Sequence, residues 1–501
     1  MKKDRSKTSR IVALILAGLM IFSALFSALM SMGVFHVHAH AETMDTQYSI
    51  SAQMLPDEQI LRCEQTIVYT NGTDEKLSQL FFSCYLNALR RQETLPFDGN
   101  DIAEAYPQGF APGGVQFYAV MVDGEAASWG VQGEGETFLR VAVDLEPGES
   151  AEIFLQYDLL LPVCSGFAGA GAFDWRLTNA FPAVCPYENG AFRTNGALAA
   201  GRFAFADAAD WQLQLTVPEG YILASGGIGG MEKTENGQVK WTRSIENARD
   251  MAIAIGRRYT VFASENDGRI GVYANDSAAA KAALETAEKA MALYENRFGP
   301  YPWDSLDIVM SQFAQGLRSA PGLVLLNKEQ FALAERDELE YSVVFALAQQ
   351  FFGEAVGVDP YDEPWLTEGV AGLCAMLYYR EIYGEERLLE EMRARVEPAL
   401  KVTIPGGVRA DSSAAYFNSR AEYETVLRGR GTAALYELML AMGREEMPAA
   451  LRIYYGQNCF GEGTIESFVG ACNAAAGGEW GCFLTEMLAS IGTDARQTEW
   501  Y

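Results

Sequence analysis

The side chains best suited to hold a transition metal or to act as a general base are imidazoles, and this chain carries only 3. They lie together near the N-terminus, at His36, His38 and His40. No histidine follows residue 40, so the rest of the chain contains neither a Ser-His-Asp triad nor a Cys-His nucleophile pair. Alternation would place the three imidazoles on one side of an extended strand. Because a single flexible segment binds a metal weakly, we expect no metal site there.

Two motifs in the second half of the chain have the spacing of a catalytic centre. Residues 344–353 read V-F-A-L-A-Q-Q-F-F-G, and residues 359–369 read D-P-Y-D-E-P-W-L-T-E-G. The pair resembles the active-site helices of the aminopeptidase N-like zinc metallopeptidases, whose pattern is V-H-E-L-A-H-Q-W-F-G followed by D-P-W-x-x-x-W-L-x-E-G. The residues that flank the catalytic positions are present here at the family's separation.

The resemblance implies what each catalytic position has become. In the family, two imidazoles at i and i+4 hold zinc on one helix face, the Glu between them activates the metal-bound water, and a carboxylate from the next helix completes the site. Here that H-E-x-x-H motif is replaced by Phe345-Ala346-Leu347-Ala348-Gln349, and only Glu368 keeps the identity of the third ligand. One carboxylate beside an amide is a poor zinc site, so we predict no metal and no cofactor.

A third stretch resembles the strand that binds the substrate's α-amine in the family, where its pattern is G-x-M-E-N. Residues 316–323 read G-L-R-S-A-P-G-L. Aligned on Gly316, Arg318 takes the place of the Met, and Ser319 takes the place of the Glu that holds the amine.

A fourth stretch, residues 427–431, reads L-R-G-R-G and resembles the family's V-Y-x-K-G. Arg428 therefore stands where a Tyr stabilises the tetrahedral oxyanion. The whole match covers about residues 45–490 and lacks the long C-terminal helical domain of the larger members.

Because the metal ligands, the base, the amine anchor and the oxyanion donor all differ together, we predict an inactive relative that keeps the cleft. The degenerate positions are Phe345, Ala346, Gln349, Ser319 and Arg428. The cleft candidates are Gly316, Arg318, Ser319, Glu368 and Arg428, with Glu368 as the vestigial ligand. A buried carboxylate needs a partner, so we expect Arg428 or Arg318 to lie beside Glu368. The alternative is a partly hydrated Glu368 at a helix start.

The pattern of apolar residues and turns predicts the elements that position these residues: an N-terminal antiparallel β-sandwich, followed by an α+β, mostly helical domain. The resemblance implies that this second domain is thermolysin-like. Residues 42–262 alternate polar and apolar side chains between turn signals such as Pro147-Gly148, with no long helical pattern. The sequon Asn71-Gly72-Thr73 is interpreted as one of these turns.

Residues 263–495 are the predicted peptidase-like domain with the degenerate zinc motif. A helix is expected from Asn275 to Arg297, capped by Asn275 or Asp276. A strand pair is expected at Leu306–Met310 and Leu323–Leu326. Further helices are expected at about 336–354, 366–381, 384–399, 421–442 and 445–455.

Residues 1–41 are predicted to be a signal peptide or an N-terminal membrane anchor. A basic opening precedes an apolar run from Ile11 to Phe35 that is long enough to span a bilayer, whereas Ala39-His40-Ala41 is an A-x-A cleavage signal. Both interpretations place the rest of the chain outside the cytoplasm, either anchored by residues 11–35 or secreted after cleavage near Ala41.

The net charge bears on which partners the chain can bind, and the cysteines bear on which disulfides it can form. With 38 basic and 66 acidic residues the net charge is -28, which repels phosphate backbones and argues against nucleic-acid binding. An oxidising compartment would favour disulfides, and the expected bridges are Cys164 with Cys185, and Cys459 with Cys472 or Cys482. Cys374 is expected to be a buried thiol.

Three functions are consistent with these features. The first is an extracytoplasmic pseudopeptidase that binds a peptide or protein in the cleft. The second is an active metallopeptidase with a non-histidine metal site, recruiting Asp359, Asp362 or Glu363 around Glu368. The third is a structural subunit of a membrane complex, which a cleft filled by Phe345, Phe351 and Trp365 would favour. An open cleft with a polar floor would favour the first.

Overall fold

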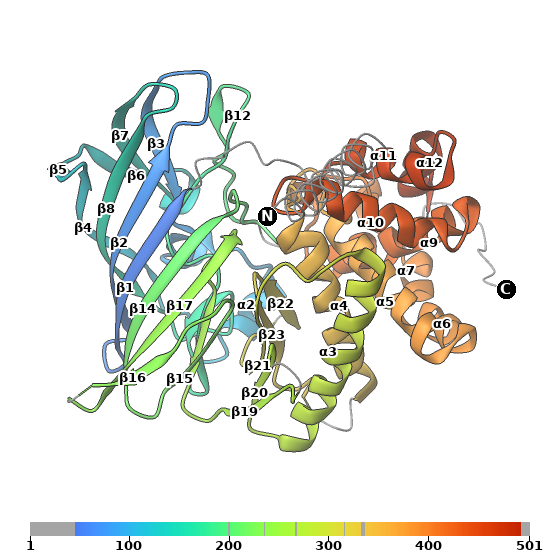
Figure 1. Ribbon diagram of the computed structural model, residues 1–501, viewed down its shortest axis with the longest axis horizontal. Helices are drawn as coiled ribbons and strands as arrows, with labels where there is room; N and C mark the ends of the chain where they lie inside the picture. The colour runs from blue at the N-terminus through green and yellow to red at the C-terminus, as the bar shows by residue number, and fades with distance from the viewer. Residues whose placement is uncertain are drawn as a thin grey trace, which may run out of the picture. The chain divides into compact units, whose positions relative to one another are not determined.

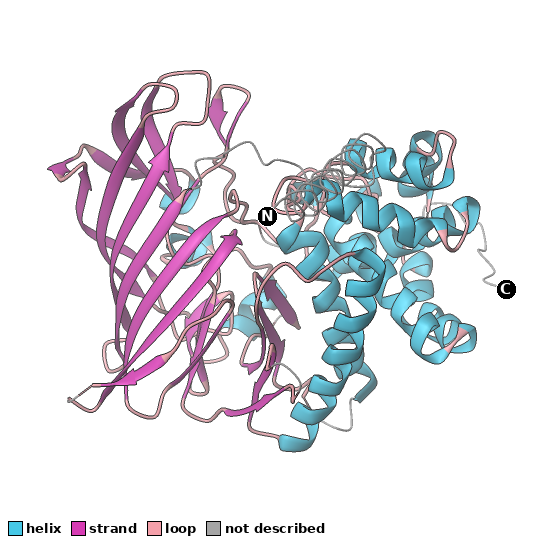
Figure 2. Ribbon diagram, viewed as in Figure 1, coloured by secondary structure: helices cyan, strands magenta, loops and turns pink. Residues whose placement is uncertain are grey.

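The computed structural model of the chain describes residues 46–198, 201–234, 236–265, 268–314, 316–331 and 336–491. A sheet-rich region comes first and a mostly helical region follows, as predicted (Figures 1 and 2). The apolar segment 11–35, the histidine run, the cleavage signal and the boundary after residue 41 lie outside the described residues. Within those residues, no helix has both the length and the apolar character that crossing a bilayer requires.

A large sheet forms one layer of the first region. Its strands, in spatial order, are β16 (Met231–Lys233), β17 (Gln238–Ala248), β14 (Ala209–Pro218), β1 (Gln47–Leu55), β2 (Ile60–Thr70), β8 (Ser150–Leu160), β4 (Gly114–Val122) and β5 (Glu125–Ala126). Its side chains alternate between core and solvent, as the period of a strand requires: in β1, Tyr48, Ile50, Ala52 and Met54 are buried.

Two smaller sheets and a hairpin complete the first region. One sheet has the order β15 (Ile222–Ser225), β18 (Ile253–Gly256), β10 (Asp174–Leu177) and β9 (Ala168–Ala170). The other has the order β11 (Ala183–Val184), β3 (Leu77–Ser83), β7 (Phe138–Leu145) and β6 (Trp129–Gln132). The hairpin is β12 (Tyr187–Glu188) with β13 (Ala191–Phe192). Because residues of the sheets share one apolar core, the predicted sandwich is confirmed.

Two details of this region differ from the prediction. Strands β1 and β14 run parallel, whereas the other neighbours in the large sheet are antiparallel. The chain makes a long excursion between them, so no hairpin imposes opposite directions, and the rings of Tyr48 and Trp211 stack 3.8 Å apart across the pair. A short helix, α2 (Gly99–Ala105), also interrupts the strands, capped by the Asp98 side chain.

A five-stranded sheet begins the second region. Its order is β19 (Thr260–Ala263), β20 (Ile270–Ala274), β21 (Leu306–Ser311), β23 (Leu323–Asn327) and β22 (Leu317–Ala320). The expected strand pair is therefore present as β21 and β23, which run parallel, while β22 pairs antiparallel with β23 at the edge. This edge strand carries Arg318 and Ser319.

Helices make up the rest of the second region. They are α3 (Ser277–Phe298), α4 (Arg336–Gln349), α5 (Trp365–Tyr383), α6 (Glu385–Glu391), α7 (Glu397–Lys401), α8 (Arg420–Tyr423), α9 (Gly431–Met442), α10 (Glu446–Asn458), α11 (Ile465–Ala476) and α12 (Gly481–Ser490). Asp276 caps α3 through its side chain, as expected. The last two helices were not predicted.

Three predicted helices are broken by π-helical segments. The expected helix 336–354 leaves α-helical geometry after Gln349 and continues as Gln350–Ala355. The expected helix 384–399 is divided by Met392–Val396, and the expected helix 421–442 is divided by Glu424–Arg430. Such segments rotate the side chains that follow them, which residue periodicity alone does not reveal.

None of the eight cysteines forms a disulfide, so the expected bridges are wrong. Cys164 lies in a loop and donates to the carbonyl of Ala168, whereas Cys185 is fixed beside β3 by its backbone bond to Phe81. Cys459 is half-buried and Cys482 is exposed. Cys374 is a buried thiol, as expected.

Asp307 on β21 generates a prediction about pH and stability. Its Oδ2 accepts the backbone N–H of Ser225 at 2.9 Å, and burial raises the pKa of the carboxyl to about 7. The folded protein therefore keeps a proton that the unfolded chain releases above its ordinary pKa, so the free energy of unfolding falls as pH rises towards 7. Asp307→Asn should therefore make the decrease in the free energy of unfolding between pH 5 and pH 8 smaller, by at most about 3 kcal/mol.

Urea unfolding of both proteins at the two pH values measures this difference. The exposed Asp57→Asn is a matched control and should leave the pH dependence as it is. An equal loss of stability in wild type and Asp307→Asn would contradict the assignment.

Candidate functional site

Glu368 lies at the start of α5 and faces the end of α4. It is 3% exposed, and its Oε1 accepts from the Gln349 side chain, Nε2 to Oε1 3.2 Å. Gln349 is the last residue of α4, so the change to π-helical geometry begins directly after it. The two side chains at the second-ligand and third-ligand positions of the resemblance are therefore in direct contact.

Arg428 is the partner of Glu368. Its Nε and Nη2 donate to Glu368 Oε2 at 3.2 and 3.1 Å. Its guanidinium carbon lies 4.3 Å from the centre of the Phe345 ring, within the range of a cation–π contact. Burial lowers the pKa of Arg428, but the charges of Glu368 and Glu424 outweigh burial and hold the pKa above its usual value. The expectation that Arg428 or Arg318 pairs with Glu368 is confirmed for Arg428.

A close helix crossing brings the two charges together. A Cβ added to Gly369 would lie 3.1 Å from the carbonyl carbon of Gly431, so α5 and the start of α9 touch through backbone. One turn further on, a Cβ added to Gly372 would overlap the hydroxyl of Thr432. Because Glu368 precedes the first glycine and Arg428 lies one turn before Gly431, this crossing fixes their separation.

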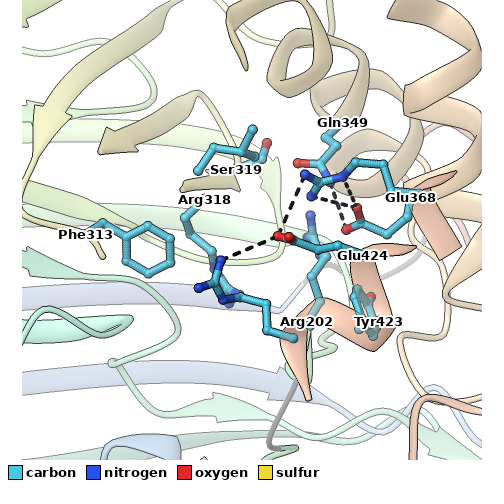
Figure 3. Close-up of a pocket in the computed structure, with 12 residues that line it drawn as sticks. Arg202, Phe313, Arg318, Ser319, Gln349, Glu368, Tyr423 and Glu424 are labelled. Atoms are coloured by element: carbon cyan, nitrogen blue, oxygen red, sulfur yellow. Dashed lines mark hydrogen bonds and ion pairs between the residues drawn. The ribbon is translucent and has the colours of Figure 1, made fainter. Parts of the chain in front are cut away.

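A cavity of about 60 Å³ lies over this pair. Figure 3 shows Gln349 and Glu368 side by side at it. Its polar lining comes from the sheet, the helices and the sandwich: Arg202, Arg318, Ser319, Gln349, Glu368, Arg420, Tyr423, Glu424 and Arg428. Four of the five cleft candidates therefore meet at one cavity, and Gly316 lines two adjoining hollows of about 950 and 380 Å³. Phe345 and Ala346 are fully buried and are not part of the cavity lining.

The Ser319 hydroxyl is engaged in a hydrogen bond with Gln350. Its hydroxyl accepts from Gln350, Nε2 to Oγ 2.6 Å, and the same amide donates to the Ala320 carbonyl. The Gln350 oxygen accepts from the Tyr301 hydroxyl and the Gly322 backbone N–H. This saturated amide fixes the edge strand β22 against the end of α4, which is a structural role.

Two of the arginines at the cavity are paired with acids that are not part of its lining. Arg202 lies 2.6 Å from Glu354, and Arg420 lies 3.2 Å from Asp101 and 3.1 Å from Glu104.

Arg318 has no such acid. Its Nη2 donates to the Asn179 side chain at 2.6 Å, and no carboxylate among the described residues forms an ion pair with it. Its buried Nε has no hydrogen-bond acceptor in that part of the chain. Burial first, and then the charge of Arg202, lower its pKa to about 10.

The acids proposed for a non-histidine metal site lie elsewhere. Asp359 accepts from the backbone of Tyr361 and is 3.6 Å from Arg193, while Glu363 accepts from the backbone N–H of Ile465 at 3.1 Å. Across the described ranges, no group of three or more His, Cys, Asp or Glu side chains could hold a metal ion. Both oxygens of Glu368 are engaged by Arg428 and Gln349, so the donor set does not fit the family's zinc.

Sequence reasoning missed Arg202, Arg420, Tyr423 and Glu424. Arg420 and Glu424 could have been found, because they precede Arg428 at intervals of four residues and would share a helix face. Arg202 carried no such signal, because it comes from the sandwich region and meets the site only through the fold.

The sequence is similar to a known family model and to known aminopeptidases. Residues 282–489 match the model of the peptidase family M1 domain. The chain is 24% identical over 401 residues to aminopeptidase M1-A of Oryza sativa subsp. japonica, covering 73% of this chain and 44% of that protein. It is 24% identical over 280 residues to aminopeptidase N of Lactobacillus delbrueckii subsp. lactis, covering 52% of this chain and 32% of that protein. The chain spans less than half the length of these curated relatives.

The fold is also similar to solved structures. The crystal structure of an M1 zinc metallopeptidase from Deinococcus radiodurans has a TM-score of 0.60 and 16% sequence identity, and the match covers 89% of this chain and 94% of that one. A mutant of that peptidase matches with a TM-score of 0.62 over 89% of this chain and 95% of that one. These matches show a shared fold.

The ion pair at the helix crossing predicts a measurable coupling. Arg428→Met should lower the free energy of unfolding by about 3 kcal/mol, because it leaves the Glu368 carboxylate buried with only an amide partner. Adding Glu368→Gln should restore at least half of the loss, because the remaining pair is then neutral. Urea unfolding followed by circular dichroism measures both values.

The exposed Arg258→Met serves as the control, with an expected change within about 0.5 kcal/mol. If the Arg428→Met loss is below about 1 kcal/mol, or the double variant recovers nothing, the pair does not stabilise the crossing.

Proposed function

The chain is an aminopeptidase N-like homologue whose residues 282–489 belong to peptidase family M1, and from this premise we propose that it is a pseudopeptidase. It binds a peptide or a protein segment in the cleft and does not hydrolyse it. The observation that carries the proposal is the Arg428–Glu368 pair. Glu368 stands at the position of the family's third zinc ligand, and its carboxylate is bound by the Arg428 guanidinium instead of being free for a metal.

Chemistry at the neighbouring positions supports the same proposal. Phe345 has no donor atom for a metal, Ala346 has no group to accept a proton from water, and Gln349 turns its amide nitrogen towards Glu368. Zinc-dependent hydrolysis needs at least three protein ligands and a base near the metal-bound water. The side chains at these positions supply one ligand, already paired, and no base.

The state of the cleft favours binding over a purely structural role. The aromatic side chains of Phe345, Phe351 and Trp365 are buried in the core and leave the cavity floor polar. Strand β22 is the edge of its sheet and its residues 317–319 line the cavity, so an extended peptide could pair with it. One of the solved structures with a similar fold, at a TM-score of 0.60, is a mutant of the Deinococcus radiodurans peptidase bound to a Tyr-Ser-Ala substrate.

The proposal places this function outside the cytoplasm. The basic opening and the apolar run of residues 11–35 would direct export, and the protein then stays anchored or is released near Ala41. Its partner is a peptide or protein ligand, with the membrane as a second partner if the segment is retained.

Metal content and hydrolysis test the proposal directly. The purified protein should contain no stoichiometric zinc by elemental mass spectrometry, and it should hydrolyse no aminoacyl amide with or without added zinc. Labelled peptides should nevertheless bind, as measured by fluorescence anisotropy. Zinc-dependent turnover that survives purification would overturn the proposal in favour of an active metallopeptidase.

A designed variant tests whether Arg428 blocks the metal position. Phe345→His with Gln349→His supplies two imidazoles at i and i+4, yet this pair of substitutions should gain little zinc affinity while Arg428 holds Glu368. Adding Arg428→Tyr should raise zinc affinity by at least about tenfold, because it frees the carboxylate and removes a repelling charge. Equal affinities with and without that third substitution would show that Arg428 is no obstacle.

A further inference from the structure

The cavity over the Arg428–Glu368 pair is basic in a chain whose net charge is -28. Its lining carries four arginines and two glutamates. Glu368 is committed to Arg428, and Glu424 lies 3.8 Å from Arg428 and 3.9 Å from Arg420. Arg202 and Arg420 also pair with acids that are not part of the cavity lining, namely Glu354, Asp101 and Glu104. The fourth arginine, Arg318, forms no ion pair with a carboxylate of the described residues.

The surroundings of Arg318 are those of a cation that lacks its counter-ion. Its hydrogen-bond partner is the neutral amide of Asn179, and its guanidinium carbon lies 5.7 Å from the centre of the Phe203 ring. Two acids, Glu354 and then Asp250, favour the charged form of Arg318 from a distance. Glu354 is already paired with Arg202. Asp250 accepts the backbone N–H of Asn179, and burial raises its pKa to about 7. A buried charge held in this way is stabilised by any anion that can reach it.

The cavity has room for such an anion. Its volume of about 60 Å³ is several times the roughly 15 Å³ needed to hold one water in the same measure, so a carboxylate group fits. It shares Arg420 with one adjoining hollow and Arg428 with the other, so a longer chain has a way in from either side.

We propose that this cavity binds the carboxylate of a peptide, with Arg318 as the principal contact and Arg202 and Arg420 beside it. The inference rests on the proposed peptide binding and names the ligand's chemical class. It also inverts the preference that the resemblance would imply: where the family has a Glu for a cationic amine, this chain has Ser319 beside Arg318.

The larger adjoining hollow favours a ligand with an isolated negative charge. The largest adjoining hollow is lined by Glu104, Glu329 and Glu338 together with Arg420. A polyanion that enters through this hollow passes these carboxylates, and like charges at short range repel it. A peptide that carries one carboxylate among neutral residues suits both the arginine-lined cavity and the acidic hollow beside it.

The experiment compares matched peptides by isothermal titration calorimetry, without a charged label. Acetylated, amidated hexapeptides of Ala and Ser carry one Glu, one Gln or one Lys at the third position, and a fourth peptide has the Gln but a free C-terminal carboxylate. We expect the Glu peptide or the free-carboxylate peptide to bind at least about tenfold more tightly than the neutral Gln peptide. The stronger of the two identifies a side chain or a C-terminus as the source.

Two variants tie the preference to Arg318. Arg318→Gln should remove the preference for the carboxylate while leaving the thermal midpoint equal or higher, because it deletes an uncompensated buried charge. Arg318→Lys should keep part of the preference. Arg258 is exposed and is not part of the cavity lining, so Arg258→Gln should bind as wild type does.

The outcomes separate this inference from the proposed function. If all four peptides bind equally, or if Arg318→Gln keeps the full preference, the carboxylate site is overturned while peptide binding stands. If no peptide binds, both fail. A tighter fit of the Lys peptide would show that the cleft has kept the family's preference for a cation.

Discussion

The contact between Arg428 and Glu368 is the interaction on which the rest of the cleft depends. It forms where α5 and the segment before α9 cross at Gly369 and Gly431, so the backbone approach of the two helices also sets the distance between the charges. A carboxylate that is 3% exposed cannot be left unpaired without a large cost, and the guanidinium removes that cost. Gln349 and the ring of Phe345 complete the surroundings of the pair, which joins α4, α5 and the segment Glu424–Arg430.

Under the proposed function, this arrangement gives the fold of an M1 peptidase a substitute for the charge of the metal. A zinc ion supplies positive charge at the meeting point of three ligands, and here a fixed guanidinium supplies it from the chain itself. The proposed pseudopeptidase offers a ligand arginines in place of an activated water.

Much of the site followed from local sequence. The spacing of the residues that flank them located Glu368 and Gln349. Because a buried acid requires a cationic partner, the sequence also indicated Arg428 or Arg318 beside Glu368, and Arg428 is the one in contact. The choice between those two could not be made from sequence, because each lies in a different element and only their approach to Glu368 distinguishes them. Arg318 instead meets Asn179, a residue of the sandwich, across a separation of 139 positions.

The sequence by itself determined the kinds of element, the absence of imidazole beyond residue 40, and the identities Phe345, Ala346 and Gln349 at one motif. These properties depend on residue identity and on neighbours a few positions away, which set periodicity, capping and donor chemistry. The tertiary structure alone decided the parallel pairing of β1 with β14, the separation of the thiols, the π-helical breaks and the gathering of arginines at one cavity. Those features arise because segments far apart in the chain approach one another, and burial at the point of contact then fixes which charges are paired.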